Sequence, residues 1–343
     1  MKKYSFKNDY AEGCHPNILA ALSQTNLVQQ NGYGEDEYSA EAKRLIQKKI
    51  NNVDASVYFV SGGTQANLLV ISSLLRPYES VIAAETGHIF TNETGAIEAT
   101  GHKIHSVPTA DGKLKPAHIQ SVLDNHANKP HQLKQKLVYI SNSTEIGTIY
   151  SRKELQELSD YCKDHQLYLF MDGARLGHAL TSEANDMSLE DVSALTDIFY
   201  LGGTKNGALL GEAIAINNPK LQYDFDYNIK QKGALLAKGR ILGIQFLELM
   251  KDDLYFDLAR HANTQAMRIK AAFRENGITF LSETYTNQIF PILTNSQIEK
   301  LQRDFDFYIW QKIDETHSAI RLITSWSTNS DRVNELIHQI KSL

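Results

Sequence analysis

Short apolar runs alternate with longer amphipathic stretches between residues 56 and 216, and this alternation constrains the fold more than any other sequence feature. Several runs are almost continuously apolar, as expected for strands covered on both faces of a sheet. The stretches between them have helical patterns, and one opens with a capping-box sequence from Ser151 to Glu154. The alternation predicts a mostly parallel sheet between helix layers. We expect strands at 56–60, 80–84, 137–141, 167–171, 197–201 and 212–216, and helices at 64–75, 116–126 and 151–165.

The pattern changes after residue 245, where long helical stretches and short strands follow one another. Helices are expected at 254–276, at 295–305 and from 330, and strands at 278–282, 288–293 and 319–325. A chain of 343 residues exceeds what one hydrophobic core usually holds, which favours two domains. We therefore predict a large α/β domain at residues 15–245 and a smaller α+β domain at 246–343.

Composition narrows the class of protein. The formal net charge of -5 argues against nucleic acid as a main ligand, because phosphate backbones bind to basic faces. Cys14 and Cys162 are the two cysteines, so neither a disulfide framework nor a zinc-binding spacing is expected, and no metal site is predicted. No apolar run at the start resembles a signal peptide, and none elsewhere is long enough to span a bilayer. We expect a cytoplasmic protein that binds neither membranes nor nucleic acid.

Ligands of such sheets bind at the carboxyl ends of the strands, so the residues that follow the apolar runs are candidates for function. The first candidate is the turn at residues 61–67, which contains Gly62, Gly63 and Thr64 and leads into a helix. Glycines allow close approach of the backbone to a ligand, and a helix N-terminus attracts phosphate. The alternative is an ordinary tight turn between a strand and a helix.

Two further candidates follow later strands. Asp172 can meet a cationic ring nitrogen through a charge-assisted hydrogen bond, and Arg175 can bind a carboxylate with two parallel bonds. Lys205 lies among small residues, where a lowered pKa would let its amine form an imine. Taken singly, these residues could equally be a surface acid, a surface arginine and a solvated lysine.

The order of the three candidates favours one elongated cofactor. Asp172 and Lys205 are 205 − 172 = 33 residues apart, which leaves room for one helix and one strand between them. A phosphate turn, an acid and a lysine on separate strands suit a ligand with a phosphate, a ring nitrogen and an aldehyde.

At this point the sequence resembles a known family. It is similar, over nearly its whole length, to the threonine aldolase and β-eliminating lyase family of fold type I pyridoxal-phosphate enzymes, most of all to the low-specificity L-threonine aldolase and phenylserine aldolase branch. Nine stretches in the same order carry the resemblance: NDY at 8–10, YGED at 33–36, GTQAN at 63–67, ETGH at 85–88, TEIGTIY at 144–150, MDGAR at 171–175, GGTKNG at 202–207, residues 233–242 and IR at 320–321.

The resemblance implies a role for each matching residue. Lys205 would hold pyridoxal 5'-phosphate as a Schiff base, Asp172 would pair with its ring nitrogen, and His88 would stack on the ring. The phosphate would be held by Gly63 and Thr64, with Thr204 a further candidate. The substrate carboxylate would be bound by Arg175 and Arg321, with Asn8 nearby. Residues 1–14 would pack near this site.

The resemblance also implies a homodimer or homotetramer with shared active sites, in which Tyr33 and Lys238 reach the cofactor of the neighbouring subunit. Many members have a histidine after an Asn-Thr pair at the position of residues 142–145, whereas here Thr144 is followed by Glu145. The base that acts on the substrate hydroxyl would then be Glu145, His88 or a water.

The expected activity is cleavage of L-threonine-like β-hydroxy-α-amino acids to glycine and an aldehyde, in amino-acid metabolism. The nearest alternative is a β-eliminating lyase or an aminotransferase on the same scaffold. A catalytically silent binder would not need two carboxylate-binding arginines. A nucleotide-binding module is less consistent, because the glycine turn lacks both a dinucleotide fingerprint and a Walker lysine.

Overall fold

The computed structural model describes residues 3–343 and contains a seven-stranded central sheet in the order β2-β8-β7-β6-β5-β3-β4. β8 is antiparallel to both of its neighbours, and the other strands run in one direction. The predicted mostly parallel sheet is therefore confirmed. Its strands are β2 (Ser56–Val60), β3 (Glu79–Ala84), β4 (Ile104–Val107), β5 (Lys134–Ser141), β6 (Tyr168–Asp172), β7 (Ile198–Gly202) and β8 (Glu212–Ile216).

Alternate residues of these strands enter two separate cores, one on each face of the sheet. Val138 and Ile140 belong to the core beneath α2, α5, α6, α8 and α10, whereas Leu137 and Tyr139 belong to the core beneath α3 and α9. The helices of this part are α1 (Pro16–Thr25), α2 (Glu37–Lys49), α3 (Gly63–Leu74), α4 (His88–Thr91), α5 (Pro116–Asn125), α6 (Arg152–Asp164), α7 (Leu176–Leu180), α8 (Leu189–Leu195), α9 (Phe225–Gln231) and α10 (Arg240–Met250), with short 3₁₀ turns η1 (Glu98–Thr100), η2 (Pro219–Leu221) and η3 (Lys251–Asp253).

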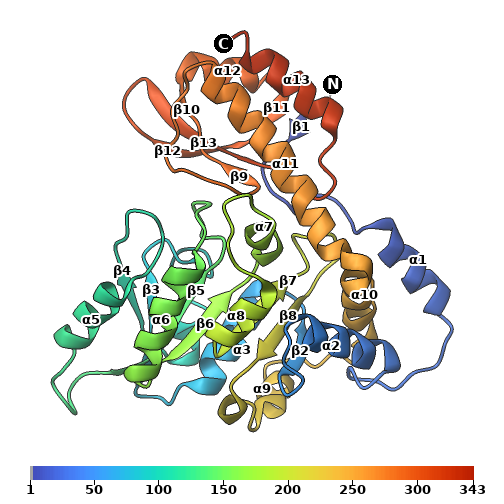
Figure 1. Cartoon of the computed structure of the whole chain (residues 1–343), viewed down its shortest axis with the longest axis vertical. Helices are drawn as coiled ribbons and strands as arrows, with labels where there is room; N and C mark the ends of the chain where they lie inside the picture. The colour runs from blue at the N-terminus through green and yellow to red at the C-terminus, as the bar shows by residue number, and fades with distance from the viewer. Residues whose placement is uncertain (1–2) are drawn as a thin grey trace.

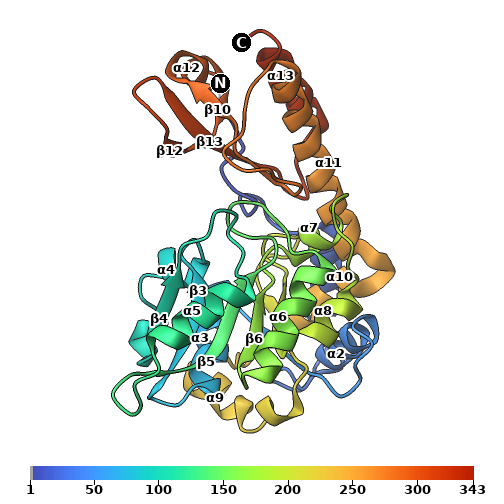
Figure 2. The same ribbon diagram turned by 60° about the vertical axis from the view of Figure 1, so that its left-hand side comes forward.

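A second, smaller sheet stands over one end of the first, and the long helix α11 (Leu254–Glu275) connects the two (Figures 1 and 2). Its strands are antiparallel, and Phe273, Ile320 and Leu336 lie in a core of its own. Near the N-terminus, β1 (Tyr4–Ser5) pairs with β11 (Phe305–Asp306) of this part. The remaining elements are β9 (Gln288–Ile289), β10 (Ile292–Thr294), α12 (Asn295–Leu301), β12 (Tyr308–Lys312), β13 (His317–Ile323) and α13 (Ser330–Ile340).

Most expected elements are present within a few residues, but two expectations were wrong. Residues 278–282 make only one bridge, Phe280 to Pro291, because proline has no N–H with which to extend the ladder. The helix expected at 295–305 ends at Leu301, since the chain then turns to pair with β1. The expected domain boundary near residue 246 falls inside α10 and stays a prediction. Among residues 3–343, no helix is long and apolar enough to cross a membrane.

Candidate active site

A cavity of about 570 Å³ lies between the carboxyl edge of the central sheet and the small sheet. Its walls come from the turns that follow β2, β3, β5, β6 and β7, from the N-terminal segment, and from β9, β12 and β13. The structure brings ten of the twelve predicted site residues to this cavity: Asn8, Gly63, Thr64, His88, Glu145, Asp172, Arg175, Thr204, Lys205 and Arg321. Within the described residues, no cluster of side chains could hold a metal ion.

Asp172, the last residue of β6, is buried and accepts four hydrogen bonds. Tyr139 Oη and Tyr200 Oη donate to it at 2.6 and 2.5 Å, Asn67 Nδ2 at 3.1 Å and the Ala174 amide at 3.0 Å. Burial alone would raise the pKa of Asp172, but the hydrogen bonds from the two tyrosines and the Ala174 amide, together with His88, lower it below its ordinary value. The site therefore keeps a carboxylate where a ligand cation could bind.

Lys205 follows β7 on a turn that only small residues permit. A Cβ at Gly202 would lie 2.4 Å from the carbonyl oxygen of Ala174, and one at Gly203 would lie 2.7 Å from that of Gly211. The close packing brings the lysine into the cavity, where burial lowers its pKa and the charge of Arg175 lowers it further. Lys205 is thus a better nucleophile at neutral pH than an exposed lysine.

The N-terminus of α3 provides a place for an anion. No side chain caps this twelve-residue helix, whose N-cap is Gly62, so its first N–H groups remain available at the cavity. Ser61 before it is fixed by Gln65, whose side-chain oxygen accepts from the Ser61 amide at 3.0 Å. Thr204 lies at the same cavity and accepts a hydrogen bond of 2.9 Å from the Gly211 amide. A phosphate at this turn would meet N–H donors and a helix dipole.

The two predicted arginines differ in their partners. Arg175 makes a two-bond pair with the buried Asp9, with Nε 2.7 Å from Oδ2 and an Nη 3.1 Å from Oδ1. Burial raises the pKa of Asp9, but Arg175 outweighs burial and holds it well below its ordinary value. Arg321 stacks over Trp310 at 4.6 Å from the ring centre, and within the described chain its Nε has no hydrogen-bond partner. Arg321 is therefore ready for an incoming anion.

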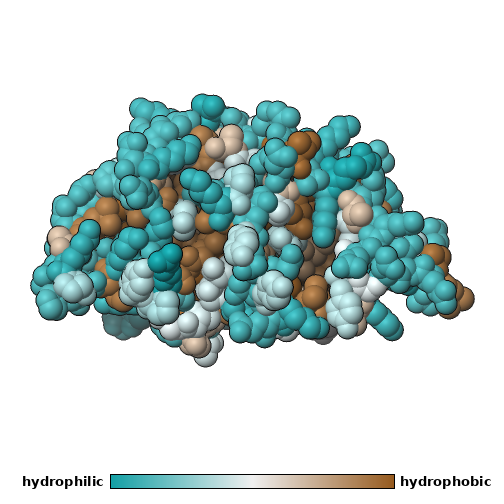
Figure 3. Space-filling model, turned by 90° about the horizontal axis from the view of Figure 1, so that it is seen from below, coloured by the Kyte–Doolittle hydropathy of each residue, from teal (hydrophilic) through white to brown (hydrophobic). Residues whose placement is uncertain are grey.

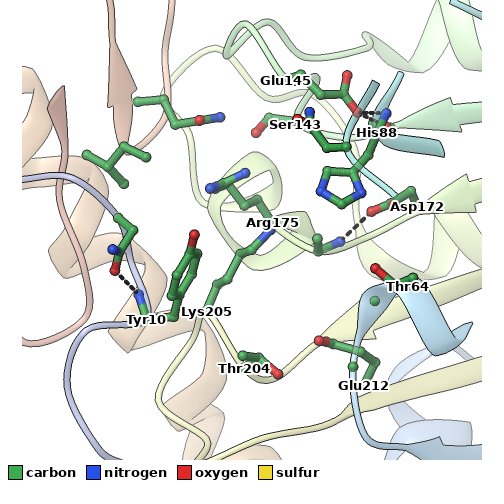
Figure 4. A pocket seen from close by; sticks show the side chains of 18 of the residues that line it. Tyr10, Thr64, His88, Ser143, Glu145, Asp172, Arg175, Thr204, Lys205 and Glu212 are labelled. Carbon is green, nitrogen blue, oxygen red and sulfur yellow. Dashed lines mark hydrogen bonds between the residues drawn. The ribbon is translucent and has the colours of Figure 1, made fainter. Parts of the chain in front are cut away.

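Glu145 lies at the other end of the cavity from Thr204, and the ring of His88 lies between Glu145 and Asp172 (Figure 4). His88 Nδ1 is 2.9 Å from Glu93, which is linked to Asp172 because Asn67 Nδ2 donates to both carboxylates. Glu145 accepts from Ser141 Oγ at 2.7 Å and from the His88 amide at 2.9 Å. Burial raises the pKa of Glu145 above its ordinary value, which makes its carboxylate a stronger base.

Tyr33 and Lys238 do not line this cavity. The Tyr33 amide donates to the carbonyl oxygen of Ala237 at 3.1 Å, so the two predicted residues come from neighbouring segments, and both are exposed. Their expected action on another subunit stays a prediction.

Sequence reasoning missed several residues of the cavity or of its supports, among them Asp9, Tyr139, Tyr200 and Glu212. The tyrosines could have been found, because each lies in a strand beside that of Asp172: Tyr200 follows Phe199, the partner of Met171, and Tyr139 lies two residues before Ser141, the partner of Asp172. Glu212 was not predicted because β8 is antiparallel, so that its first residue, and not the residue after its last, lies at the active edge of the sheet.

Comparison with known proteins identifies the family to which the chain belongs. The family model of the beta-eliminating lyases matches residues 9–296. The low specificity L-threonine aldolase of Pseudomonas aeruginosa is 34% identical over 340 residues, which cover 98% of this chain and 96% of that protein.

Among solved structures, the threonine aldolase of Leishmania major superposes with a TM-score of 0.97 at 48% identity, covering 99% of both chains. An aspartate aminotransferase of Thermus thermophilus, a double mutant, has a TM-score of 0.72 at 12% identity, covering 99% of this chain and 91% of that one, and is a likeness of fold alone. The predicted fold type, a large α/β part with a small second part, is thereby confirmed. On the sequence match along most of its length, the chain belongs to the beta-eliminating lyase family.

Proposed function

We propose that the protein is a pyridoxal-phosphate-dependent lyase that cleaves L-threonine-like β-hydroxy-α-amino acids to glycine and an aldehyde. One observation carries the proposal: a half-buried lysine, a buried carboxylate whose pKa is lowered, and an arginine whose Nε has no hydrogen-bond partner among residues 3–343 share one cavity. This set can hold an aldehyde, a ring cation and a substrate carboxylate together. The names of the relatives, threonine aldolases from a bacterium and a protozoan, agree with it.

The cavity fits the cofactor at each of its functional groups. Gly63 and Thr64 at the uncapped start of α3, with Thr204 beside them, would hold the phosphate. Asp172 would pair with the ring nitrogen, His88 would lie against the ring, and Lys205 would bind the aldehyde carbon. When bound, pyridoxal phosphate supplies an electron sink for the bond broken at the substrate α-carbon.

The remaining work belongs to side chains of this protein. Arg321 binds the substrate carboxylate, and Arg175 and Asn8 line the same cavity. Asp9 holds Arg175 by both of its bonds, which leaves the guanidinium little freedom to turn. A carboxylate fixed in this way determines which substituent of the α-carbon stands in the breaking position, and so which bond breaks.

Glu145 accepts the proton of the β-hydroxyl in this proposal. Its raised pKa makes it a stronger base than an exposed glutamate. The hydrogen bonds from Ser141 and the His88 amide fix one of its oxygens. His88 is held through Nδ1 by Glu93, which suits it to a positioning role against the ring.

A homodimer or homotetramer completes the proposal, with Tyr33 and Lys238 acting on a neighbouring subunit. α1 and the segment after it project from the body as an arm (Figure 1), and Figure 3 shows hydrophobic residues at the same projecting end. Leu19, Leu27 and Val28 of this arm are 55%, 93% and 45% exposed. Apolar side chains gathered on an arm of this kind favour burial against another copy of the chain.

An assay of product release across threonine, allo-threonine, phenylserine and serine tests the proposed reaction. We expect equal amounts of glycine and aldehyde from the first three substrates, and a Lys205→Ala variant should release neither. A keto acid with ammonia would indicate β-elimination instead, and an exchanged amino group would indicate transamination. Either result would replace aldol cleavage as the main activity.

A further inference from the structure

Glu212 occupies a position that the proposed reaction does not use. It is the first residue of β8, paired with Val60 on one side and with Gly202 on the other. Val60 ends β2 just before the anion-binding turn, and Gly202 ends β7 just before the lysine turn. The register therefore directs Glu212 between the two turns, and Figure 4 shows it beside Thr64 and Thr204, at the opposite end of the cavity from Glu145.

Glu212 is 4% exposed, and the partner of its Oε2 is a backbone amide, that of Gly203 at 2.9 Å. The titratable groups that face it are Lys205 and Asp172 at the cavity, Tyr200 on β7 and Tyr255 on α11. Burial raises the pKa of Glu212 to about 8, although Lys205 and the hydrogen bonds act in the opposite direction. In the free protein the acid is thus largely neutral at pH 7.

An acid at this place conflicts with a phosphate unless the acid is neutral. The phosphate ester is a dianion above its second pKa of about 6, and a carboxylate in the same enclosed space would repel it. A neutral carboxyl group removes the repulsion and adds an O–H donor.

We propose that Glu212 is a proton-linked part of the phosphate site, and that it takes up one proton from solvent whenever it is ionised and the phosphate ester binds. The inference rests on the proposed function, because the phosphate belongs to the proposed cofactor. No other bond forms or breaks in this step.

The direction of the pH effect follows from linkage. Below pH 8 Glu212 already carries its proton, so binding requires none. Above pH 8 each bound phosphate must bring a proton with it, and the dissociation constant rises about tenfold for each pH unit. Between pH 7 and pH 9 we expect the affinity to fall by about a factor of ten.

A cofactor analogue without the aldehyde, 4-deoxypyridoxine 5'-phosphate, cannot bond to Lys205, so comparison of the wild-type protein with a Glu212 variant separates the Glu212 effect from protonation of the ring nitrogen beside Asp172. Calorimetric titrations at pH 7 and pH 9, in two buffers with different ionisation enthalpies, give both the affinity and the number of protons taken up. Wild-type protein should bind about tenfold more weakly at pH 9 and take up close to one proton there. Glu212→Gln keeps an acceptor for Gly203 and cannot titrate, so its affinity should fall less between the two pH values, and at pH 9 it should take up about one proton fewer than the wild-type protein.

Glu145→Gln is the matched control, since it removes another carboxyl group of raised pKa from the far end of the same cavity. It should keep the wild-type pH dependence. The inference is overturned if Glu212→Gln retains that dependence, or if the wild-type protein takes up no proton at pH 9. A wild-type protein that does not bind the analogue at either pH overturns the proposed cofactor as well, so the two failures can be told apart.

Discussion

Asp172 retains its charge in a place without solvent because four donors replace the water that it has lost. Asparagine has the same shape but no charge, and it cannot keep a ring nitrogen protonated. We predict that Asp172→Asn lowers the aldol-cleavage rate at least about a hundredfold, since each ~1.4 kcal/mol of lost transition-state stabilisation is a factor of ten. Steady-state rates with threonine measure this, and Asp160→Asn on the exposed side of α6 is the control. Full activity in Asp172→Asn would remove the ring-nitrogen role.

Glu145 gives the reaction a pH signature. A base must be ionised, so activity is lost as pH falls through its pKa in the folded protein, and burial places that pKa above the ordinary glutamate value. We predict an acid limb of kcat at higher pH than an exposed glutamate would give. Glu145→Gln should lack this limb and be about a hundredfold slower or more. A profile of kcat from pH 5 to 9 in both proteins tests this prediction. If the acid limb is unchanged in Glu145→Gln, the base is another residue.

Arg321 is predicted to bind the substrate carboxylate. Its replacement by glutamine should raise KM and lower kcat together, by about ten- to a hundredfold in kcat/KM, the worth of one charged hydrogen bond. Arg332→Gln, which removes an exposed arginine paired with Glu335, should leave both constants unchanged. If Arg321→Gln behaves like that control, the carboxylate is bound by other residues.

Site residues that follow parallel strands could be predicted from the sequence. Those that depend on a long-range contact or on an antiparallel strand could not. Lys205 and Asp172 could be predicted because a strand end places its next residues at the ligand edge. Asp9 could not, because its partner Arg175 is 166 residues away and only the folded chain brings the two together. Glu212 could have been found if β8 had been recognised as antiparallel.

Among the elements, the turn after β5 joins the two parts of the molecule. Gly147 has a positive φ of 81°, and a Cβ there would lie 2.6 Å from Thr284 Cγ2, in the segment before β9. Ser282 Oγ also donates to the carbonyl oxygen of Ile146 at 2.8 Å. The same turn carries Glu145, so the small sheet is held against the residue proposed as base.

We predict that Gly147→Ala destabilises the fold and weakens substrate binding, because the added methyl group pushes the small sheet and Arg321 away. Gly277→Ala is the matched control: its φ is 71°, but a Cβ there meets nothing within 4 Å. Both variants incur the cost of a left-handed conformation, about 1 kcal/mol. The free energy of unfolding in urea should therefore fall more, and KM for threonine rise more, in Gly147→Ala than in Gly277→Ala. Equal changes in the two variants would exclude the contact with Thr284 as the cause.

The order of elements was predicted more reliably than their ends. The strands of the central sheet could be predicted from apolar runs, because a strand that is covered on both faces carries apolar side chains along nearly its whole length. Residues 278–282 and 302–305 were misassigned, because a proline in the partner and a distant strand decided their conformation. Neither influence can be read from the local pattern.

For the whole molecule, the proposed sharing of sites between subunits makes a prediction by mixing. Lys205→Ala removes the amine of a subunit's own site, and Lys238→Ala removes a residue predicted to serve its neighbour. Dissociated and reassembled in equal amounts, the two inactive variants should regain about a quarter of the wild-type activity, because half the dimers are mixed and each has one intact site. A mixture that stays inactive would show that Lys238 does not act across subunits.

The pairing of β1 with β11 has a consequence for how the enzyme comes into being. The strand partners of residues 4 and 5, residues 305 and 306, are synthesised 301 positions later in the chain. Asn8 and Asp9 come shortly after β1, so the cavity is complete only when residues as far along the chain as Arg321 and Ile323 have been synthesised. A nascent chain that has not reached residue 305 therefore lacks both the strand partner of β1 and Arg321 of the cavity.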